Sequence, residues 1–587
     1  MKKKNFVVSS SLDFLIPDKN QNLIFYGNWC FTNLKKKIEK KNFQILNYHW
    51  DDQKKLEKDH AYIKKIYGIL SKDLAVFLNQ THKKNFSKEY WEQLYGIWLI
   101  RFIIFTFDKY STVRKLSKKK IYSYYYVDLK NKLIPNTSSE ANFLFQDEYF
   151  NHKIFTDISL QLRPNIIFIE KKIPNIRSSF SNAKLNFSFS LNLLSFLFKK
   201  IKKKNEIFII SSYLGLFKEI LLQFKINGFP KFNFCKKIDK KFSISNFLRS
   251  KKITNKKDDN FLKLIKSILI KNMPASYLEG YDYILEKSLL YRWPNAPKAI
   301  FTTNIHFNYD VFKVWLAFKR ENKAKLVVGQ HGAGYTFSKF HSDYDLDVNN
   351  CDNFISWGKK KYKNKKIFQG FNFRTKKKFE RNNKKNILLV QHFPYKYTTR
   401  LVSNDHNFSN INKNIKMQKL FIKNLNNKVT SVVKIRLFSS ENFYPDIHNY
   451  EKDQWHNLKK KYVFETRKVP IERSINNAKI VIINTIHSTL FFECLSSNIP
   501  CVLFSSFPLN TIQMECREDF ANLKKIGIIQ DDPLKFSKFL NKKINFIDEW
   551  WNEKKILKIK NKFIKNYCYF ENNTVKEIKN KLISINL

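Results

Sequence analysis

Three adjacent polar residues, His487, Ser488 and Thr489, come shortly after a run of four β-branched residues at 480–483. Helix N-termini leave backbone N–H groups unpaired and carry a partial positive charge, so hydroxyl and imidazole groups placed there can hold a phosphate. Glu493 lies four residues after Thr489 and shares its helical face, where a carboxylate can accept a sugar hydroxyl. The pattern predicts a site for a phosphate and a sugar hydroxyl at a strand-to-helix turn. Simple helix capping by Ser488 or Thr489 explains the same pattern equally well.

A second candidate is the turn Gln330-His331-Gly332-Ala333-Gly334, which follows a predicted strand at 325–328. The whole chain has only 12 Gly, so their concentration here marks a place where the backbone approaches something closely. The turn lies at the carboxyl end of its strand, which is where open α/β sheets bind ligands. We therefore favour a functional role for His331, with a purely structural histidine as the alternative.

Two further positions carry charge at predicted strand ends. Arg436 ends a strand predicted at 431–435, and the planar guanidinium suits phosphate. A partly buried structural arginine is equally plausible there. Asp51 and Asp52 follow a strand predicted at 43–48, where they can act as bases or cap the next helix.

These residues need a scaffold of alternating strands and helices, and the chain has one. Strands are predicted at 22–26, 207–211, 298–303, 325–328 and 386–390, with helices near 56–77, 87–116 and 309–320. Strands alternating with helices indicate parallel sheets and an α/β fold. The charged segment at 374–385 has no apolar periodicity and is predicted to link two halves of the chain.

The composition narrows the function classes. The 587 residues are too many for one core and suggest two to four domains. The formal charge of +58 is mostly lysine in short runs along the whole chain, beside abundant Asn, Ile and Phe. That mixture is typical of A/T-rich codon usage. A solvated lysine surface therefore explains the charge better than a polyanion groove, and we expect no nucleic-acid partner.

The seven cysteines show no C-x-x-C spacing and no histidine at ligand spacing, so neither structural zinc nor a disulfide framework is expected. No secretion signal and no run of about 18 uncharged apolar residues is evident. We expect a cytoplasmic protein. Peripheral contact with the inner face of a membrane stays open.

Three regions together resemble a family. The segments are LIFYGNWC…NYHWDDQKKL, HFNYDVFKVWLAFKRENKAKLVVGQHGAGY…ISWG and IRLF…HSTLFFECLSSNIPCVLF…DEWW. In this order they resemble transferases encoded in O-antigen and surface-polysaccharide loci. More loosely, QHG with HST-x-x-x-E resembles capsular Kdo transferases and poly(glycerol phosphate) transferases. Those proteins have the GT-B arrangement, in which two Rossmann-like domains face a cleft.

The resemblance implies an acceptor-side α/β domain at 1–378, a nucleotide-donor domain at 379–545 and a C-terminal helical segment at 546–587 that packs back on the first domain. It implies metal-independent transfer of a sugar from a nucleotide-activated donor to a glycan or lipid-linked glycan, with no further cofactor. The implied donor ligands are Arg436, His487, Ser488 and Thr489 for phosphate, Glu493 for ribose, and Gln330 and Gly332 from the glycine-rich turn.

The acceptor hydroxyl also needs a base. His331 is the first candidate, because imidazole accepts a proton near pH 7, and Asp51 and Asp52 are the second. Family members tend to have an acid where this chain has Asn28, and an amide cannot serve as a base. Two other functions remain open: transfer of a phosphoalditol of the glycerophosphate type, and non-catalytic binding of a glycan or polyanion.

Overall fold

The computed structural model describes residues 4–18, 21–32, 42–162, 165–173, 206–228, 235, 238–253, 258–291, 293–374, 379, 384–392, 395–401, 408–438, 445–455 and 462–584. The strands within them form three sheets, and every strand pairing within these sheets is parallel. The α/β fold with parallel sheets is therefore confirmed. The predicted linker at 374–385 lies largely outside the described residues.

The first sheet has the order β3-β2-β1-β4-β5 and the second the order β10-β9-β8-β7-β6. The strands of the first are β1 (Asn5–Val8), β2 (Asn22–Phe25), β3 (Phe43–Ile45), β4 (Tyr122–Tyr126) and β5 (Ile166–Glu170). Those of the second are β6 (Ile207–Ile209), β7 (Ala299–Thr302), β8 (Lys325–Gly329), β9 (Asn353–Ile355) and β10 (Ile367–Phe368). The residues before 374 thus build two sheets.

The third sheet has the order β13-β12-β11-β14-β15-β16. Its strands are β11 (Asn386–Val390), β12 (Val433–Arg436), β13 (Val463–Glu465), β14 (Ala478–Ile483), β15 (Cys501–Phe504) and β16 (Ile529–Gln530). Numbered within the sheet, this is the Rossmann order 3-2-1-4-5-6. Its topological switch point lies between β11 and β14, where a ligand crevice is expected at the carboxyl ends of the strands.

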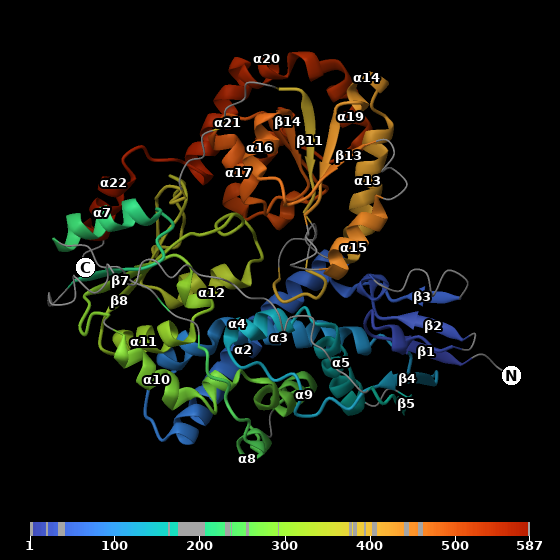
Figure 1. Cartoon of the computed structure of the whole chain (residues 1–587), viewed down its shortest axis with the longest axis vertical. Helices are drawn as coiled ribbons and strands as arrows, with labels where there is room; N and C mark the ends of the chain where they lie inside the picture. The colour runs from blue at the N-terminus through green and yellow to red at the C-terminus, as the bar shows by residue number, and fades with distance from the viewer. Residues whose placement is uncertain are drawn as a thin grey trace.

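Helices cover and connect the sheets (Figure 1). Those before residue 374 are α2 (Gln53–His82), α3 (Lys88–Val113), α4 (Ser138–Leu144), α5 (Glu148–Leu162), α7 (Leu216–Asn227), α8 (Asn246–Ser250), α9 (Asn260–Leu269), α10 (Tyr281–Leu290), α11 (Asp310–Glu321) and α12 (Ser342–Asn350). Those after it are α13 (Ile411–Lys423), α14 (Asn427–Thr430), α15 (Pro445–Gln454), α16 (Ile471–Asn476), α17 (Thr489–Ser496), α18 (Arg517–Lys525), α19 (Pro533–Lys543), α20 (Ile547–Asn552), α21 (Lys554–Tyr567) and α22 (Thr574–Ser584).

The two longest helices, α2 and α3, begin at good N-caps. The Asp52 carboxylate accepts from the backbone N–H groups of Lys54 and Lys55, and the Ser87 hydroxyl accepts from that of Tyr90. Such caps satisfy N–H groups that the first helical turn leaves unpaired. Nearly all of α3 is buried, which explains why it is apolar on every face.

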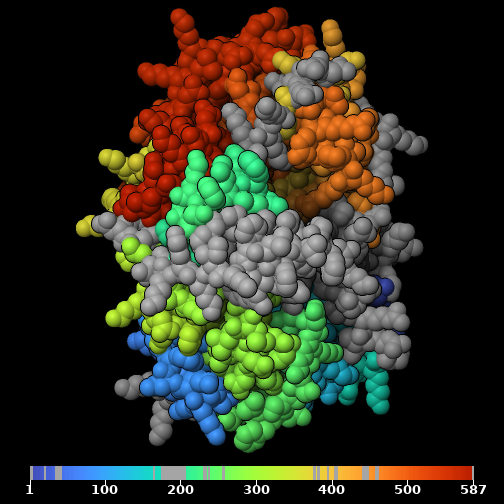
Figure 2. All heavy atoms as spheres, turned by 60° about the vertical axis from the view of Figure 1, so that its left-hand side comes forward, coloured from blue at the N-terminus to red at the C-terminus, as the bar shows by residue number. Residues whose placement is uncertain are grey.

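The C-terminal helices cross between two parts of the molecule. Helices α20 and α21 lie on the third sheet's side. Near the end of α21, the carbonyl of Asn566 packs against Gly358, which follows the second sheet's strand β9. Helix α22 packs beside α7 (Figures 1 and 2) and adds Val575, Ile578 and Leu582 to a core cluster of the second sheet. The C-terminal helix therefore returns to the sheet that precedes the third one in the chain. No helix in the described part of the chain is both long enough and apolar enough to cross a membrane.

Candidate functional site

A cavity of about 430 Å³ opens at the switch point of the third sheet. Its lining comes from the segment after the second sheet, the carboxyl ends of β11, β12 and β14, the segment after β13, and α17: Arg374, Val390, Gln391, His392, Arg436, Leu437, Phe438, Arg467, Val469, Pro470, Ile471, Ile483, Ser488, Thr489, Leu490 and Glu493. Its position is the one that the strand order predicts for a ligand. Its size falls in the usual range for small-molecule sites.

The two strands at the switch point are tied together by Asn484. Its side-chain oxygen accepts from the backbone N–H of His392 at 2.8 Å, and its amide donates to the His392 carbonyl at 3.3 Å. The His392 ring lies edge-on to Phe438, with 4.7 Å between ring centroids. The carboxyl ends of β11 and β14 therefore hold a fixed spacing, and one wall of the cavity is aromatic.

The start of α17 faces this cavity through Ser488 and Thr489. Ser488 is the N-cap residue by position, but its side chain makes no capping hydrogen bond. The capping interpretation therefore does not account for its hydroxyl. Thr489 and Glu493 line the same cavity, as their four-residue spacing predicts.

The cavity is rich in arginine. Arg436 is buried and already engaged: it donates to the Ser474 hydroxyl at 2.9 Å and to the Val469 carbonyl at 2.7 Å, and pairs with Glu465 at 3.6 Å. Arg374 is more accessible, with 42% of its side chain exposed, and it pairs with Glu493 at 3.2 Å. Glu493 is therefore held beside a cation. Because Arg374, Arg436 and Arg467 all line the cavity and Glu493 is the one acidic residue of its described lining, the cavity carries an excess of positive charge.

The glycine-rich turn is held rigidly from inside. The Gln330 side chain donates to the Gly332 carbonyl at 2.8 Å and accepts from the Trp357 backbone N–H at 3.0 Å. The Trp357 indole N–H also donates to the Gln330 carbonyl at 2.6 Å. Both amide atoms of the Gln330 side chain therefore brace the turn, and this buried residue does not line the switch-point cavity.

The glycine-rich turn at 330–334 contacts the residues just before α17 at one position. A Cβ atom placed on Gly334 would lie 2.4 Å from Nδ1 of His487, and Gly334 has a φ of +88°. His487 therefore points toward the second sheet, while its neighbours Ser488 and Thr489 line the cavity. Burial and the adjacent His341 lower the pKa of His487 to about 3.

His331 lies in an aromatic and charged pocket of its own. Its Nε2 is 3.0 Å from the Tyr335 hydroxyl, and its Nδ1 is buried without a hydrogen-bond partner. Burial, with smaller contributions from His306 and Arg400, lowers the pKa of His331 to about 3, so the ring is neutral at physiological pH. Close to this pocket, Asp347 accepts from Nε2 of His306 at 2.8 Å, and burial raises the pKa of Asp347 although His306 partly offsets the effect.

Tyr213 connects this pocket with the switch-point cavity. Its ring centroid lies 6.5 Å from that of His331, and the Arg374 guanidinium lies 5.8 Å from the same ring. His331 and the arginine side of the cavity are thus separated by a single aromatic side chain.

The remaining candidates hold other structure together. Asp52 caps α2, as described above. Asp51 accepts from the Ser409 hydroxyl at 2.7 Å, and the Asn28 amide donates to the Ser409 carbonyl at 2.8 Å. Asn28 and Asp51 therefore both bind the segment η9 (Phe408–Asn410), which follows β11 in the chain, and the described contacts place neither beside the switch-point cavity.

The whole chain matches one family profile. The LIC12162 family transferase profile aligns with residues 5–582. The chain belongs to this family of transferases. No curated protein sequence matches this transferase.

Solved structures are similar only in part. A mutant of S. aureus TarM, in complex with fondaparinux, alpha-GlcNAc-glycerol and UDP, is 15% identical over 49% of this transferase and 55% of the TarM chain, with a TM-score of 0.32. The wall teichoic acid polymerase TagF is 12% identical over 52% and 85%, with a TM-score of 0.30. The Streptomyces sp. SF2575 glycosyltransferase SsfS6 is 10% identical over 64% and 90%, with a TM-score of 0.25.

Sequence reasoning missed three groups of the transferase's cavity: Arg374, Arg467 and the Gln391-His392 pair. His392 comes two residues after β11 and Arg467 two residues after β13, so both occupy strand ends that a prediction of the Rossmann order would have singled out. Arg374 comes after the second sheet and carries no local signal. Only the tertiary fold brings it to Glu493.

Proposed function

We propose that this transferase binds a nucleotide-activated sugar in the switch-point cavity and moves the sugar to a hydroxyl of a glycan or lipid-linked glycan acceptor. One observation carries the proposal: the contact between Gly334 and His487. It joins the turn that holds His331 to the turn whose next residues line the cavity. In this proposal the turn of the base and the start of the anion site are therefore in contact between the second and third sheets.

In this proposal the donor phosphates lie at the start of α17, near the Ser488 and Thr489 hydroxyls and the Arg374 guanidinium. The helix N-terminus and the arginine both favour negative charge. The nucleoside lies along the apolar wall that includes Phe438 and Ile471. Arg436 supports this wall from behind, because its own hydrogen bonds go to Ser474 and Val469.

His331 is the proposed base, and this role requires one tautomer. In the proposal Nε2–H of His331 donates to the Tyr335 hydroxyl oxygen, which lies 3.0 Å away. The lone pair of His331 is then on Nδ1, which has no partner within the described part of the chain. The pKa of about 3 keeps this lone pair unprotonated throughout the physiological pH range but makes it a weaker base than a free imidazole, so in this proposal the proton moves only as the new bond to the anomeric carbon forms.

The proposed step forms a bond between the acceptor oxygen and the anomeric carbon, while the acceptor proton moves to Nδ1 of His331. The bond between the anomeric carbon and the donor phosphate oxygen breaks, and its electron pair stays on that oxygen. Fixed cations and backbone N–H groups stabilise this charge, so the proposed reaction needs no metal ion and no further cofactor.

The proposal is tested with a panel of donors and one variant. Thermal shifts and calorimetry with CMP-, UDP-, GDP- and CDP-activated sugars identify the donor, because a ligand that binds only the folded state raises its stability. With that donor, His331→Ala is expected to lose roughly 10²–10⁴-fold in saturated turnover and to keep its donor affinity. Loss of donor affinity with intact turnover would assign His331 to donor binding.

The alternatives give different results in the same experiments. A CDP-linked alditol that binds in preference to every nucleotide sugar would make the protein a phosphoalditol transferase. A non-catalytic polyanion binder would respond to no nucleotide donor, and its affinity for anionic glycans would fall steeply with salt.

A further inference from the structure

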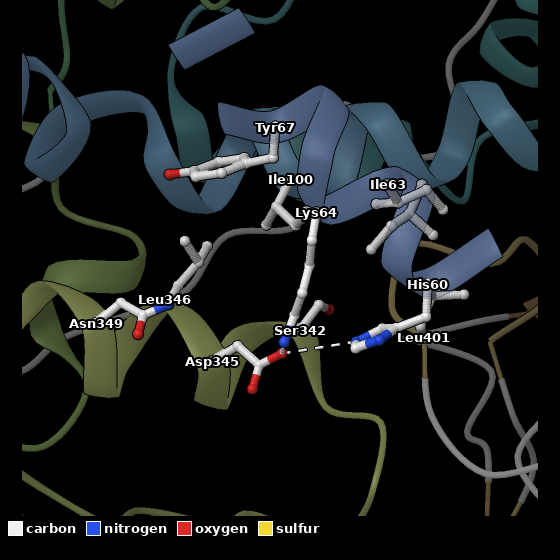
Figure 3. A pocket seen from close by; sticks show the side chains of 11 residues that line it. His60, Ile63, Lys64, Tyr67, Ile100, Ser342, Asp345, Leu346, Asn349 and Leu401 are labelled. Atoms are coloured by element: carbon white, nitrogen blue, oxygen red, sulfur yellow. Dashed lines mark ion pairs between the residues drawn. The ribbon is translucent and has the colours of Figure 1, made fainter. Parts of the chain in front are cut away.

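A second cavity, of about 160 Å³, lies between helices α2, α3 and α12 (Figure 3). It is lined by His60, Ile63, Lys64, Tyr67, Ile100, Ile104, Ser342, Asp345, Leu346, Asn349 and Leu401. None of these residues lines the switch-point cavity. The proposed function leaves this cavity without a role.

The interior of this three-helix pocket is apolar. Ile63, Ile100, Ile104, Leu346 and Leu401 form its walls, and each is at most 5% exposed. An apolar space of this size costs stability, because the atoms around it lose the contacts that packing would supply. A natural core fills such a space with side chains unless something else occupies it. Six or seven non-hydrogen atoms of a ligand have about this volume.

The mouth of the pocket is polar but electrically balanced. Lys64 extends from α2 to Asp345 on α12, with 2.6 Å between its Nζ and the carboxylate, and His60 lies 3.6 Å from the same carboxylate (Figure 3). A charged ligand group would have to break the pair of Lys64 and Asp345 to gain a partner. An uncharged polar group would leave that pair intact.

One buried hydroxyl in the pocket wall lacks a partner. Ser342 is 5% exposed, and its Oγ makes no hydrogen bond within the described structure. A buried hydroxyl without a partner is unfavourable, so native proteins usually pair it with protein, water or ligand. Figure 3 shows Ser342 beside the ends of Lys64 and Asp345 at the mouth of the pocket, where its hydroxyl can donate to or accept from a ligand hydroxyl.

From these features we infer that the three-helix pocket binds a small neutral alcohol or phenol, with its ring or branched carbon body among the isoleucines and leucines and its hydroxyl on Ser342. The inference does not depend on the proposed function. It rests on the size of the cavity, its apolar walls, its charge-balanced mouth and the unpaired Ser342 hydroxyl.

The pocket also connects to the donor side. Leu401 closes it from the segment that follows β11, and the preceding residue, Arg400, pairs at 2.9 Å with Asp343, the neighbour of Ser342. The same segment begins with Gln391 and His392 of the switch-point cavity. A ligand that packs on Leu401 and Ser342 therefore changes the contacts on both sides of the ion pair between Arg400 and Asp343. Occupancy of the two cavities is then thermodynamically linked.

The test uses the full chain and four compounds at millimolar concentration: phenol, cyclohexanol, benzoate and benzylammonium. Phenol and cyclohexanol are expected to raise the thermal midpoint by about 2 °C, and the two charged compounds to raise it less.

Two substitutions on α3 provide the matched comparison. Ile100→Phe fills the pocket, whereas Ile103, also fully buried on α3, does not line it. Ile100→Phe should keep or raise the midpoint of the free protein and abolish the shift, and Ile103→Phe should lower the midpoint by overpacking.

Three results would overturn the inference: no shift with either neutral compound, an equal shift in Ile100→Phe, or a larger shift with a charged compound than with phenol. If Ile100→Phe does not fold, Ser342→Ala and Leu401→Ala decide the question. Phenol affinity unchanged in both would also overturn it. The linkage has its own readout, since saturating phenol should change the affinity for the nucleotide donor in the wild type and not in Leu401→Ala.

Discussion

Gly334 and His487 touch across the junction of the second and third sheets, so closely that a single methyl group on Gly334 would lie 2.4 Å from the His487 ring. The two residues are 153 positions apart in the chain. Their contact sets the spacing between the turn that carries His331 and the helix start that faces the switch-point cavity. Each turn has a sequence signal of its own, but the pairing of the two is a property of the fold.

Gly334→Ala should therefore disturb this junction. The residue has a φ of +88°, which costs an L-residue about 1–2 kcal/mol, and the new methyl group must displace His487. We expect the free energy of unfolding to fall by about 1–3 kcal/mol and donor binding to weaken. Denaturant unfolding and calorimetry measure both quantities. Gly332→Ala is the matched control, because its new Cβ would meet nothing nearer than Tyr335 at 3.8 Å. Equal effects in the two variants would contradict the prediction.

Tyr335→Phe tests how His331 is oriented. The substitution keeps the buried ring and removes the hydroxyl that lies 3.0 Å from Nε2 of His331. If that hydroxyl fixes the tautomer, saturated turnover should fall by roughly 10- to 100-fold, the usual cost of losing the partner that orients a functional histidine. Donor affinity should not change. Tyr344→Phe removes a hydroxyl from the adjacent ring and serves as the control. Full activity in Tyr335→Phe would exclude the proposed tautomer.

Much of the local structure was predictable. Strands β7, β8, β11 and β14 and helices α2, α3 and α11 lie where hydrophobic periodicity places them, because each is long or strongly patterned. Ser488 and Thr489 follow the buried strand β14 and line the switch-point cavity, but their predicted role as an anion site stays a prediction. The family resemblance implied that the segment 546–587 packs back on the first domain; α22 makes this return beside α7, whereas α20 and α21 stay with the third sheet.

The roles of single side chains were less predictable, because a residue type does not reveal its partner. Gln330 has the chemistry of a ligand residue, but its side-chain amide donates to the Gly332 carbonyl and accepts from the Trp357 backbone N–H. Arg436 likewise has the chemistry of a phosphate ligand but pairs with Glu465. Such long-range hydrogen bonds leave no local pattern in the sequence.

The two arginines of the switch-point cavity should respond differently to substitution. Arg374→Ala removes an accessible cation, so we expect donor affinity to weaken by about 1.5–3 kcal/mol with little change in stability. Arg436→Ala removes two internal hydrogen bonds and leaves Glu465 without its pair, so stability should fall by about 3 kcal/mol or more. Calorimetric titration with the identified donor, beside denaturant unfolding, separates the two effects. Unaltered donor affinity in Arg374→Ala would place the donor elsewhere.

Substitutions of Asp51 and Asp52, which follow β3, should affect stability at most and leave turnover intact. Asp52→Ala removes the N-cap of α2 and should lower stability by about 1 kcal/mol, whereas Asp52→Asn keeps a capping side chain and should be nearly neutral. Saturated turnover should be intact in both, and in Asp51→Asn. Loss of turnover in Asp52→Asn or Asp51→Asn, with the fold intact, would make that carboxylate the base in place of His331.

Buried histidines should make the protein sensitive to mild acid. Burial lowers the pKa of His331 and His487 to about 3 and that of His341 to about 4, against an ordinary value of 6.5. Below pH 6.5 the unfolded chain therefore binds protons that the folded protein does not, so stability falls as the pH drops from about 6.5 toward 4. Each histidine should contribute roughly 1 kcal/mol per pH unit in this window and nothing above it.

Denaturant unfolding at several pH values measures this slope, and His341→Asn provides the sharpest comparison. Nδ1 of His341 accepts from the Tyr344 backbone N–H and caps α12, and asparagine also caps helices well. The variant should therefore match the wild type near pH 7.5 and lose less stability at pH 5, because one titrating group is gone. The Asp343 carboxylate does not interfere with this comparison. Although burial alone would raise its pKa, Arg101 and Arg400 hold that pKa below its ordinary value, so Asp343 affects stability only in stronger acid. Parallel pH profiles for the wild type and His341→Asn would show that His341 is not held neutral in the folded protein.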